Sequence, residues 1–275
     1  INDKRDWADS RLLRALCDGE AYAVPRLGDE ETVDKLQALK VYTQYRDLIS
    51  TAPLEIIYSG SADLERVKQA LAAAFATLPR EEVRVISTAA PHVCRESVQH
   101  VEDVLDVTQG KLGMGFSCGS DDMPALLMGN TLFGGSSNSK LFLNVREKLS
   151  LCYYASSLYH RQKGLITVSS GIEFQNYQRA YDEIMAQLEA VQKGELEDWE
   201  LEGARSTLLN NYATVGDSQG KLENFYLGQA ATGQHETPAD LARAIQDMTA
   251  ERICRAMSTV KLDTVYFLKG KEAEA

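Results

Sequence analysis

The residues with the clearest chemical potential lie in one stretch, FGGSSNSKLFLNVREKLSLCYY, which runs from Phe133 to Tyr154. Its glycines, small polar residues and lysine invite comparison with a phosphate-binding loop. A Walker A loop reads G-x-x-x-x-G-K-[ST], and its backbone N–H groups surround a phosphate that the lysine also reaches. Here Gly134 and Gly135 are adjacent and a leucine follows Lys140, so the spacing argues against nucleotide binding. The glycines instead predict a helix–turn–helix, with Gly134 just past the end of the first helix.

The histidines form no recognisable metal motif. An inverted zincin site reads H-x-x-E-H, and a catalytic zinc needs about three protein ligands. The chain contains His92, His100, His160 and His235, and none has a glutamate and a second histidine at the required spacing. We therefore expect no metal site within this chain, and solvated or capping roles for all four histidines.

Bulk composition limits the function and the compartment. The net charge of −11 argues against nucleic-acid partners, because an acidic surface repels a polyanion. No apolar run approaches the roughly 18–20 residues that span a bilayer, so we expect no membrane association. The five cysteines are scattered and form no CxxC pair, which favours reduced thiols in a cytoplasmic protein. The chain begins with isoleucine, which we interpret as the start of a fragment of a longer protein.

The surrounding pattern predicts the elements that position the stretch at 133–154. Helices are expected at 3–16, 30–48 (with Val33, Leu36, Leu39, Val41 and Tyr45 buried), 61–79, 122–135 and 137–149, and helical sequence at 175–258. Strands are expected at 54–60, 98–107, 111–119, 151–160, 164–172 and 262–270, the second and third being joined by a short turn. Paired strands with short turns predict an α+β fold, an antiparallel sheet with helices packed on one face.

A faint internal repeat indicates the domain organisation. Segments that begin at Glu31 and Glu236 each combine a Glu-Thr start, helical sequence and a strand that ends in glycine. Chance also produces such a pattern, so the repeat stays open at this point. If it reflects two homologous halves, the chain contains the C-terminal tail of the first half at 1–79, a linker at 80–97, a complete second half at 98–270 and a frayed tail at 271–275.

The stretch also resembles the C-terminal domain of the pitrilysin/insulinase metallopeptidases, an inverzincin family. The matching residues are Gly134, Gly135, Ser139, Lys140, Leu141, Phe142, Arg146, Glu147, Lys148, Leu151 and Tyr153. Arg146 and Tyr153 keep the family's spacing of seven, and segments 58–79, 228–234 and 265–270 extend the resemblance over nearly the whole chain. Two positions depart from the pattern. Leu149-Ser150 stands where relatives often have a basic residue and glycine, and Cys152 stands where a small residue is usual.

The resemblance implies substrate-binding roles for two residues. In family members the arginine and tyrosine that match Arg146 and Tyr153 project into a chamber and help to hold the peptide near the zinc of the first half. A guanidinium supplies fixed donors to a peptide carbonyl, and a tyrosyl O–H stabilises a developing oxyanion. The simpler alternatives are a helix-end arginine and an ordinary strand aromatic. Tyr154 should point to the opposite sheet face and pack there.

The resemblance also defines what this chain lacks. We assign no catalytic residue and no cofactor to it; the family's zinc is expected in the missing N-terminal region or in a partner subunit. The chain is expected to be inactive alone, as the substrate-holding portion of a zinc endopeptidase for unfolded peptides or of its inactive partner. The expected partners are a peptide substrate and a homologous subunit or a second copy of the chain. A non-catalytic binding or assembly subunit with the same fold is the alternative.

Overall fold

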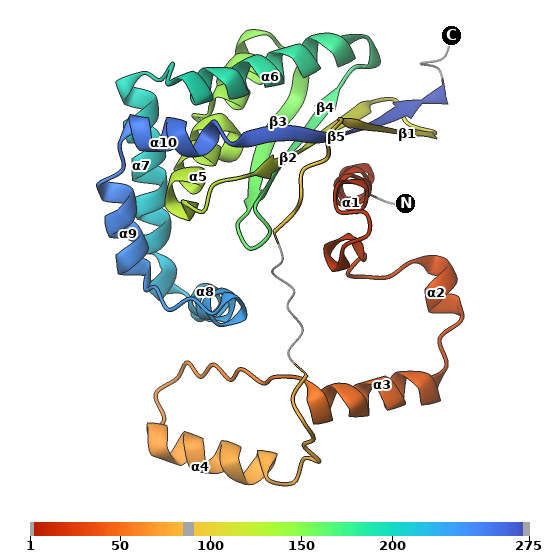
Figure 1. Cartoon of the computed structure of the whole chain (residues 1–275), viewed down its shortest axis with the longest axis vertical. Coiled ribbons are helices and arrows are strands. Elements are labelled where there is room, and N and C mark those ends of the chain that lie inside the picture. Colours follow the sequence, from red (N-terminus) through yellow and green to blue (C-terminus); the bar gives the residue numbers. More distant parts are fainter. Residues whose placement is uncertain (1–2, 85–90, 272–275) are drawn as a thin grey trace. The chain divides into compact units, whose positions relative to one another are not determined.

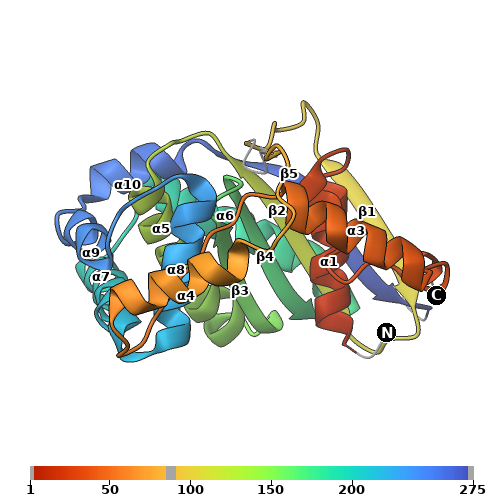
Figure 2. The same cartoon turned by 90° about the horizontal axis from the view of Figure 1, so that it is seen from below.

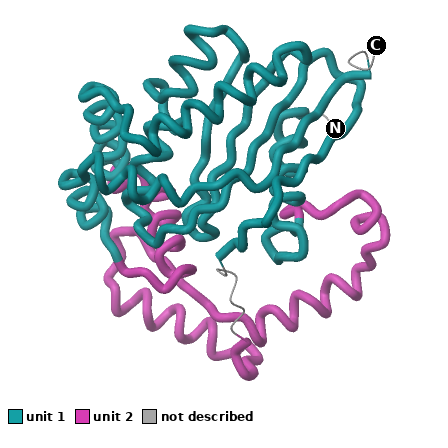
Figure 3. Tube along the Cα trace, turned by 45° about the horizontal axis from the view of Figure 1, so that its top comes forward, with its two compact units in different colours: residues 1–24, 89–214, 236–275 teal, residues 25–88, 215–235 magenta. Residues whose placement is uncertain are grey.

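The computed structural model describes residues 3–84 and 91–271. The chain forms two compact units, one of residues 1–24, 89–214 and 236–275 and one of residues 25–88 and 215–235 (Figure 3). Residues 85–90 of the expected linker and residues 272–275 of the expected tail lie outside the described part. The division into homologous halves stays a prediction.

The first unit is built on a five-stranded sheet with the order β1-β5-β2-β4-β3 (Figure 1). Its strands are β1 (Gln99–Leu105), β2 (Gly110–Cys118), β3 (Cys152–His160), β4 (Leu165–Ile172) and β5 (Val260–Gly270). The expected direct pairing of 98–107 with 111–119 is wrong, because β5 lies between β1 and β2 and runs parallel to β1. A central position suits β5, whose residues 263–268 are all buried, because such a strand is covered on both faces.

Five helices of the first unit enclose its main core on one side of the sheet (Figure 1). They are α5 (Met123–Asn130), α6 (Tyr177–Lys193), α7 (Asp198–Ala213), α9 (Pro238–Gln246) and α10 (Ala250–Met257). From β2, Leu112, Met114 and Phe116 point into this core. The α+β class is therefore confirmed. None of the helices within the described ranges is long and apolar enough to cross a membrane.

One helix, α1 (Lys4–Leu16), covers the other face of the sheet, so helices are not confined to one face (Figure 2). Glycines at alternate positions of β2 permit this close packing. A Cβ atom at Gly113 would lie 3.1 Å from Leu12 Cδ2, and one at Gly115 would lie 2.7 Å from Leu16 Cδ2. A larger residue at Gly115 would therefore require the Leu16 side chain or α1 to shift.

The second unit consists of helices and irregular segments in its described part. Its elements are α2 (Glu30–Asp34), α3 (Ala38–Thr51), α4 (Leu64–Phe75), η5 (Val215–Asp217) and α8 (Gln219–Thr232). The helix expected at 30–48 is thus two helices, and the five apolar positions expected to be buried there are exposed. Residues 54–60 form no strand among the described residues. A strand needs a neighbour for its backbone N–H and C=O groups, and this unit contains no sheet in its described part.

Candidate functional site

The stretch at 133–154 folds into two wide-turn helical segments and the start of β3. The first segment, η2 (Thr131–Gly135), continues α5, and the second is η3 (Leu141–Lys148). Both have π-helical turns, which occur frequently at functional sites. The expectation that Gly134 lies just past the end of the first helix is wrong, because η2 continues through Gly135 and Gly134 has no positive φ. A Cβ atom there would lie 2.7 Å from the backbone nitrogen of Ser157, so glycine lets η2 approach β3 closely.

Arg146 is held at the end of η3 by three contacts. Its Nε donates a hydrogen bond to the carbonyl oxygen of Tyr153 at 3.0 Å. Its guanidinium carbon lies 4.7 Å from the centre of the Phe142 ring, and Nη1 lies 3.2 Å from Glu147 Oε1. The side chain is still 40% exposed, so the guanidinium is oriented but accessible. A tight turn is what brings the arginine and tyrosine, seven residues apart in sequence, into contact.

Two backbone irregularities place Tyr153. Ser150 has a φ of +50°, the only positive value for a non-glycine residue in the described part of the chain. The ladder between β3 and β4 then shifts between Cys152 and Tyr154, which leaves Tyr153 unpaired at a bulge. Bulges often re-aim a side chain next to a functional site. Tyr153 is 58% exposed as a result, and the sequence gives no direct sign of this extra residue.

The phenol of Tyr153 faces Glu173, which follows β4. Its O–H donates a hydrogen bond to Glu173 Oε1 at 3.2 Å. This hydrogen bond and the negative charge of the carboxylate raise the pKa of Tyr153, because both favour the neutral phenol. The group is therefore a hydrogen-bond donor, not an anion, at neutral pH.

Two cavities meet at Arg146 and Tyr153. The larger has a volume of about 540 Å³ and is lined by η2, η3, β3 and Arg5 of α1. The smaller has a volume of about 390 Å³ and is lined by the turn at 150–152 together with Glu173 and Asn176. Arg146 and Tyr153 line both, so we name the two cavities together the Arg146–Tyr153 groove. Its size is in the range of roughly 300–1,000 Å³ that is usual for ligand sites.

Tyr154 has a packing role, as expected. Two cations lie near its ring, with the Arg5 guanidinium carbon 4.4 Å and the Lys111 Nζ 5.6 Å from the ring centre. A Cβ atom at Gly171 would lie 2.6 Å from the ring, so glycine at that position of β4 makes room for the tyrosine. The neighbouring aromatics thus differ: Tyr153 is presented to solvent and Tyr154 is packed.

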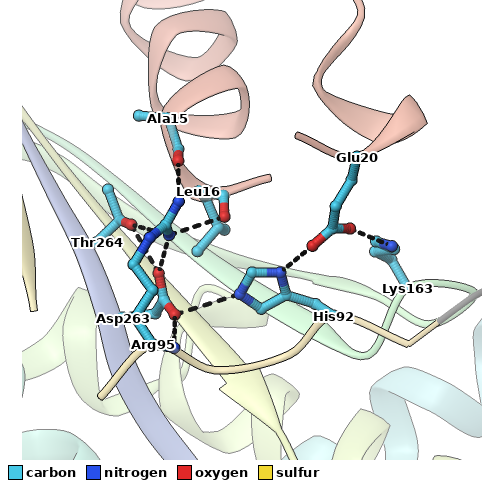
Figure 4. A network of polar contacts seen from close by, with 8 residues as sticks. All are labelled: Ala15, Leu16, Glu20, His92, Arg95, Lys163, Asp263 and Thr264. Atoms are coloured by element: carbon cyan, nitrogen blue, oxygen red, sulfur yellow. Dashed lines mark hydrogen bonds and ion pairs between the residues drawn. The ribbon is translucent and has the colours of Figure 1, made fainter. Parts of the chain in front are cut away.

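The four histidines divide into two pairs. His100 and His235 are exposed. His160 contacts Tyr22 Oη through Nδ1 and Thr167 Oγ1 through Nε2, each at 3.0 Å, and burial lowers its pKa. His92 belongs to a buried network of charged residues (Figure 4). The expectation of solvated or capping histidines is therefore wrong for His92 and His160, because both rings have polar partners from distant parts of the sequence.

Comparison with known proteins decides the family. A family model described as "Peptidase M16 inactive domain" matches residues 35–208. The chain belongs to this family. The match includes η2, η3 and most of the sheet, and it confirms the resemblance carried by the stretch at 133–154.

Individual proteins are similar to this chain over nearly its whole length. The chain is 36% identical over 278 residues to the "Probable inactive metalloprotease YmfF" of Bacillus subtilis (strain 168), an alignment that covers 98% of this chain and 64% of the relative. A solved conserved protein from Enterococcus faecalis V583 has a TM-score of 0.88 at 25% identity, over 98% of this chain and 64% of that one. A peptidase M16 inactive domain from Pseudomonas fluorescens has a TM-score of 0.77 at 16% identity, over 98% and 66%. This chain thus spans less than two thirds of the length of each of these relatives.

Proposed function

We propose that this chain is the peptide-holding portion of an M16 protease assembly and performs no hydrolysis alone. The observation that carries the proposal is the Arg146–Tyr153 groove, in which an oriented guanidinium and a neutral phenol line the same surface. Arg146 supplies fixed N–H donors to peptide carbonyl oxygens, and Tyr153 supplies one O–H donor. The substrate class is an unfolded peptide, because only an extended chain presents its carbonyl groups along a groove.

The sheet edge supports this substrate class. β3 is the last strand in the sheet order, and its residues 153–157 line the larger cavity. Extended peptides bind to such edges by adding a strand, with main-chain hydrogen bonds giving affinity. Arg146 lies at one end of this edge, where it fixes the register of a bound peptide.

We place the zinc outside this chain, in the N-terminal region of the parent protein or in a homologous partner subunit. Support for the second possibility comes from the relative named as a probable inactive metalloprotease, since an inactive subunit needs an active one for proteolysis. The assembly would be a pair with that partner or with a second copy. The five free cysteines support a reducing, cytoplasmic compartment.

A non-catalytic binding or assembly subunit is the second candidate. The hydrogen bond between Tyr153 and Glu173 favours it, because the phenol is already engaged and would have to leave Glu173 to reach a substrate. In this case the groove would hold a peptide or a partner segment without taking part in its cleavage.

Photo-cross-linking distinguishes a peptide groove from a surface without that role. A labelled unfolded peptide would be irradiated with the full-length protein, and the attached residues would be mapped by mass spectrometry. We expect labels in η3 and β3, and we expect Arg146→Ala to reduce them. Arg179→Ala is the matched control, because Arg179 is exposed on α6 and does not line the groove. Labels confined to other segments would overturn the proposal.

A further inference from the structure

A second group of polar residues lies at the end of α1 (Figure 4). None of its residues lines the Arg146–Tyr153 groove. Its centre is Asp263 of β5, which is fully buried. Asp263 accepts hydrogen bonds from the Arg95 backbone N–H at 2.7 Å and from Arg95 Nη1 at 2.6 Å. The same guanidinium also donates to the carbonyl oxygens of Ala15 and Leu16. Asp263 is therefore a firmly fixed carboxylate.

His92 lies between this carboxylate and a second one. Its Nε2 is 3.2 Å from Asp263 Oδ2, and its Nδ1 is 2.6 Å from Glu20 Oε1. A neutral imidazole has one donor and one acceptor nitrogen. If Nε2 donates to Asp263, the lone pair of Nδ1 faces a lone pair of Glu20. A neutral imidazole therefore leaves one of these two contacts without a hydrogen, whichever tautomer it adopts, and the side chain of His92 is only 3% exposed.

A third ligand atom lies beside the same two atoms. Cys17 Sγ, a carboxylate oxygen of Glu20 and a ring nitrogen of His92 all lie within 4.8 Å of one another. Cys17 and Glu20 come from one tight turn, in which Gly19 has a φ of +82° and the Glu20 N–H donates to the Cys17 carbonyl at 2.9 Å. Cys17 is fully buried. The turn therefore presents a thiol and a carboxylate side by side to the imidazole.

We propose that Cys17, Glu20 and His92 form a binding site for a zinc-class transition metal ion. Thiolate, imidazole and carboxylate are the three ligand types that proteins use for zinc, and the softness of sulfur disfavours magnesium and calcium. Tetrahedral zinc with these ligands separates the donor atoms by roughly 3.4–3.6 Å, given metal–ligand distances of about 2.0–2.3 Å. To reach that arrangement, the distance of 2.6 Å between His92 Nδ1 and Glu20 Oε1 has to widen by about 0.8 Å. A fourth position is left for water or another ligand.

The residues around the three proposed ligands are suited to a metal site. Metal-binding histidines usually donate their other ring N–H to a carboxylate, which fixes the ring and its tautomer, and Asp263 is placed to accept that hydrogen bond. Thiolate and carboxylate together neutralise a divalent ion. Lys163 contacts the second oxygen of Glu20, which orients the carboxylate. The site differs from H-x-x-E-H in its ligands and in its position in the chain. A metal ion there would connect the end of α1 to the segment at 91–95, which Asp263 in turn connects to β5.

Cobalt titration of the reduced full-length protein tests the site. Co²⁺ bound by a thiolate gives a sulfur-to-metal charge-transfer absorption that a histidine–carboxylate site does not give. We expect this band to saturate with one equivalent of Co²⁺ and to disappear in Cys17→Ala. Cys94→Ala is the matched control, because Cys94 lies two residues from His92 but is not one of the three ligands. The Cys94→Ala variant should keep the charge-transfer band.

Two further variants keep the test decisive if Cys17→Ala folds poorly. Glu20→Gln, at a side chain that is 27% exposed, should weaken Co²⁺ binding with an unchanged circular dichroism spectrum. Asp263→Asn should weaken it about 10–100-fold through the histidine. Zinc should also raise the Tm of the wild type but not of Cys17→Ala. Absence of the band in folded wild-type protein, or its persistence in Cys17→Ala, would overturn the proposal without affecting the peptide groove.

Discussion

A buried ion pair between Lys140 and Glu200 provides a quantitative prediction. Lys140 Nζ lies 3.0 Å from both carboxylate oxygens, and the two side chains are only 9% and 7% exposed. Glu200 also accepts the backbone N–H of Glu197 at 2.9 Å, as part of the capping box that begins α7. The pair therefore connects the segment before η3 to α7, and through η3 it supports the position of Arg146.

Lys140→Met should cost about 3 kcal/mol of unfolding free energy. Removal of one partner from a buried pair typically costs about 3–5 kcal/mol, because an uncompensated charge stays inside the protein. We expect the lower end of that range, since Glu200 keeps the hydrogen bond from Glu197. Glu200→Gln should cost a similar amount. The double variant should lose less than either single variant, because it leaves no unpaired charge.

Urea unfolding of the wild type, the two single variants and the double variant measures this double-mutant cycle. The midpoint and the m value are fitted for each protein. Lys193→Met is a useful control, because Lys193 forms an exposed ion pair with Glu189 on α6 and its loss should change the midpoint little. Additive losses in the double variant, or a loss below about 1 kcal/mol in Lys140→Met, would refute the reasoning that the buried charges depend on each other.

Two further predictions concern single residues. Ser150→Gly should raise the free energy of unfolding by up to about 1.5 kcal/mol, as measured in urea, because relief of a left-handed conformation gains about 1–2 kcal/mol and glycine costs about 0.5–1 kcal/mol in chain entropy. A lower free energy of unfolding would contradict this prediction and show that Ser150 makes a compensating contact. Asp122 accepts hydrogen bonds from Arg252 at 2.6 and 2.9 Å, and these lower the pKa of Asp122. A lowered folded-state pKa gives stability that is present above the unfolded-state value of about 3.9 and is lost as the pH falls through the folded-state value. Asp122→Asn should therefore be less stable than the wild type at pH 6, and the difference should shrink below about pH 4; a constant difference in unfolding free energy from pH 6 to pH 2 would contradict this.

Local signals account for the parts of the fold that could be predicted from sequence. Asp3 caps α1 by accepting the N–H groups of Arg5 and Asp6, and the helix begins and ends close to the expected residues. The motif from Gly134 to Tyr153 could be recognised because its residues are contiguous. The seven-residue spacing of Arg146 and Tyr153 corresponds to a real contact through the Tyr153 carbonyl.

Long-range pairing explains what could not be predicted. The position of β5 beside β1 depends on residues 165 apart in sequence, such as Gln99 and Thr264. The pattern of a strand does not show which strand it pairs with. The segment at 54–60 has the composition of a strand but lacks a partner in the described structure, so it stays irregular. The cluster of Cys17, Glu20 and His92 has no fixed spacing that a motif could capture, because His92 comes from a distant segment.

The central claim, that the Arg146–Tyr153 groove holds a peptide, is tested most directly by peptide affinity. Fluorescence anisotropy of a labelled unfolded peptide would compare the full-length protein with Arg146→Ala, Tyr153→Phe and the control Arg179→Ala, in the presence of any partner subunit. Hydrogen bonds from a charged group contribute about 1.5–3 kcal/mol, so Arg146→Ala should raise the Kd about 10–100-fold. Tyr153→Phe should raise it less, and Arg179→Ala should leave it unchanged. An unchanged Kd in both groove variants would contradict the account.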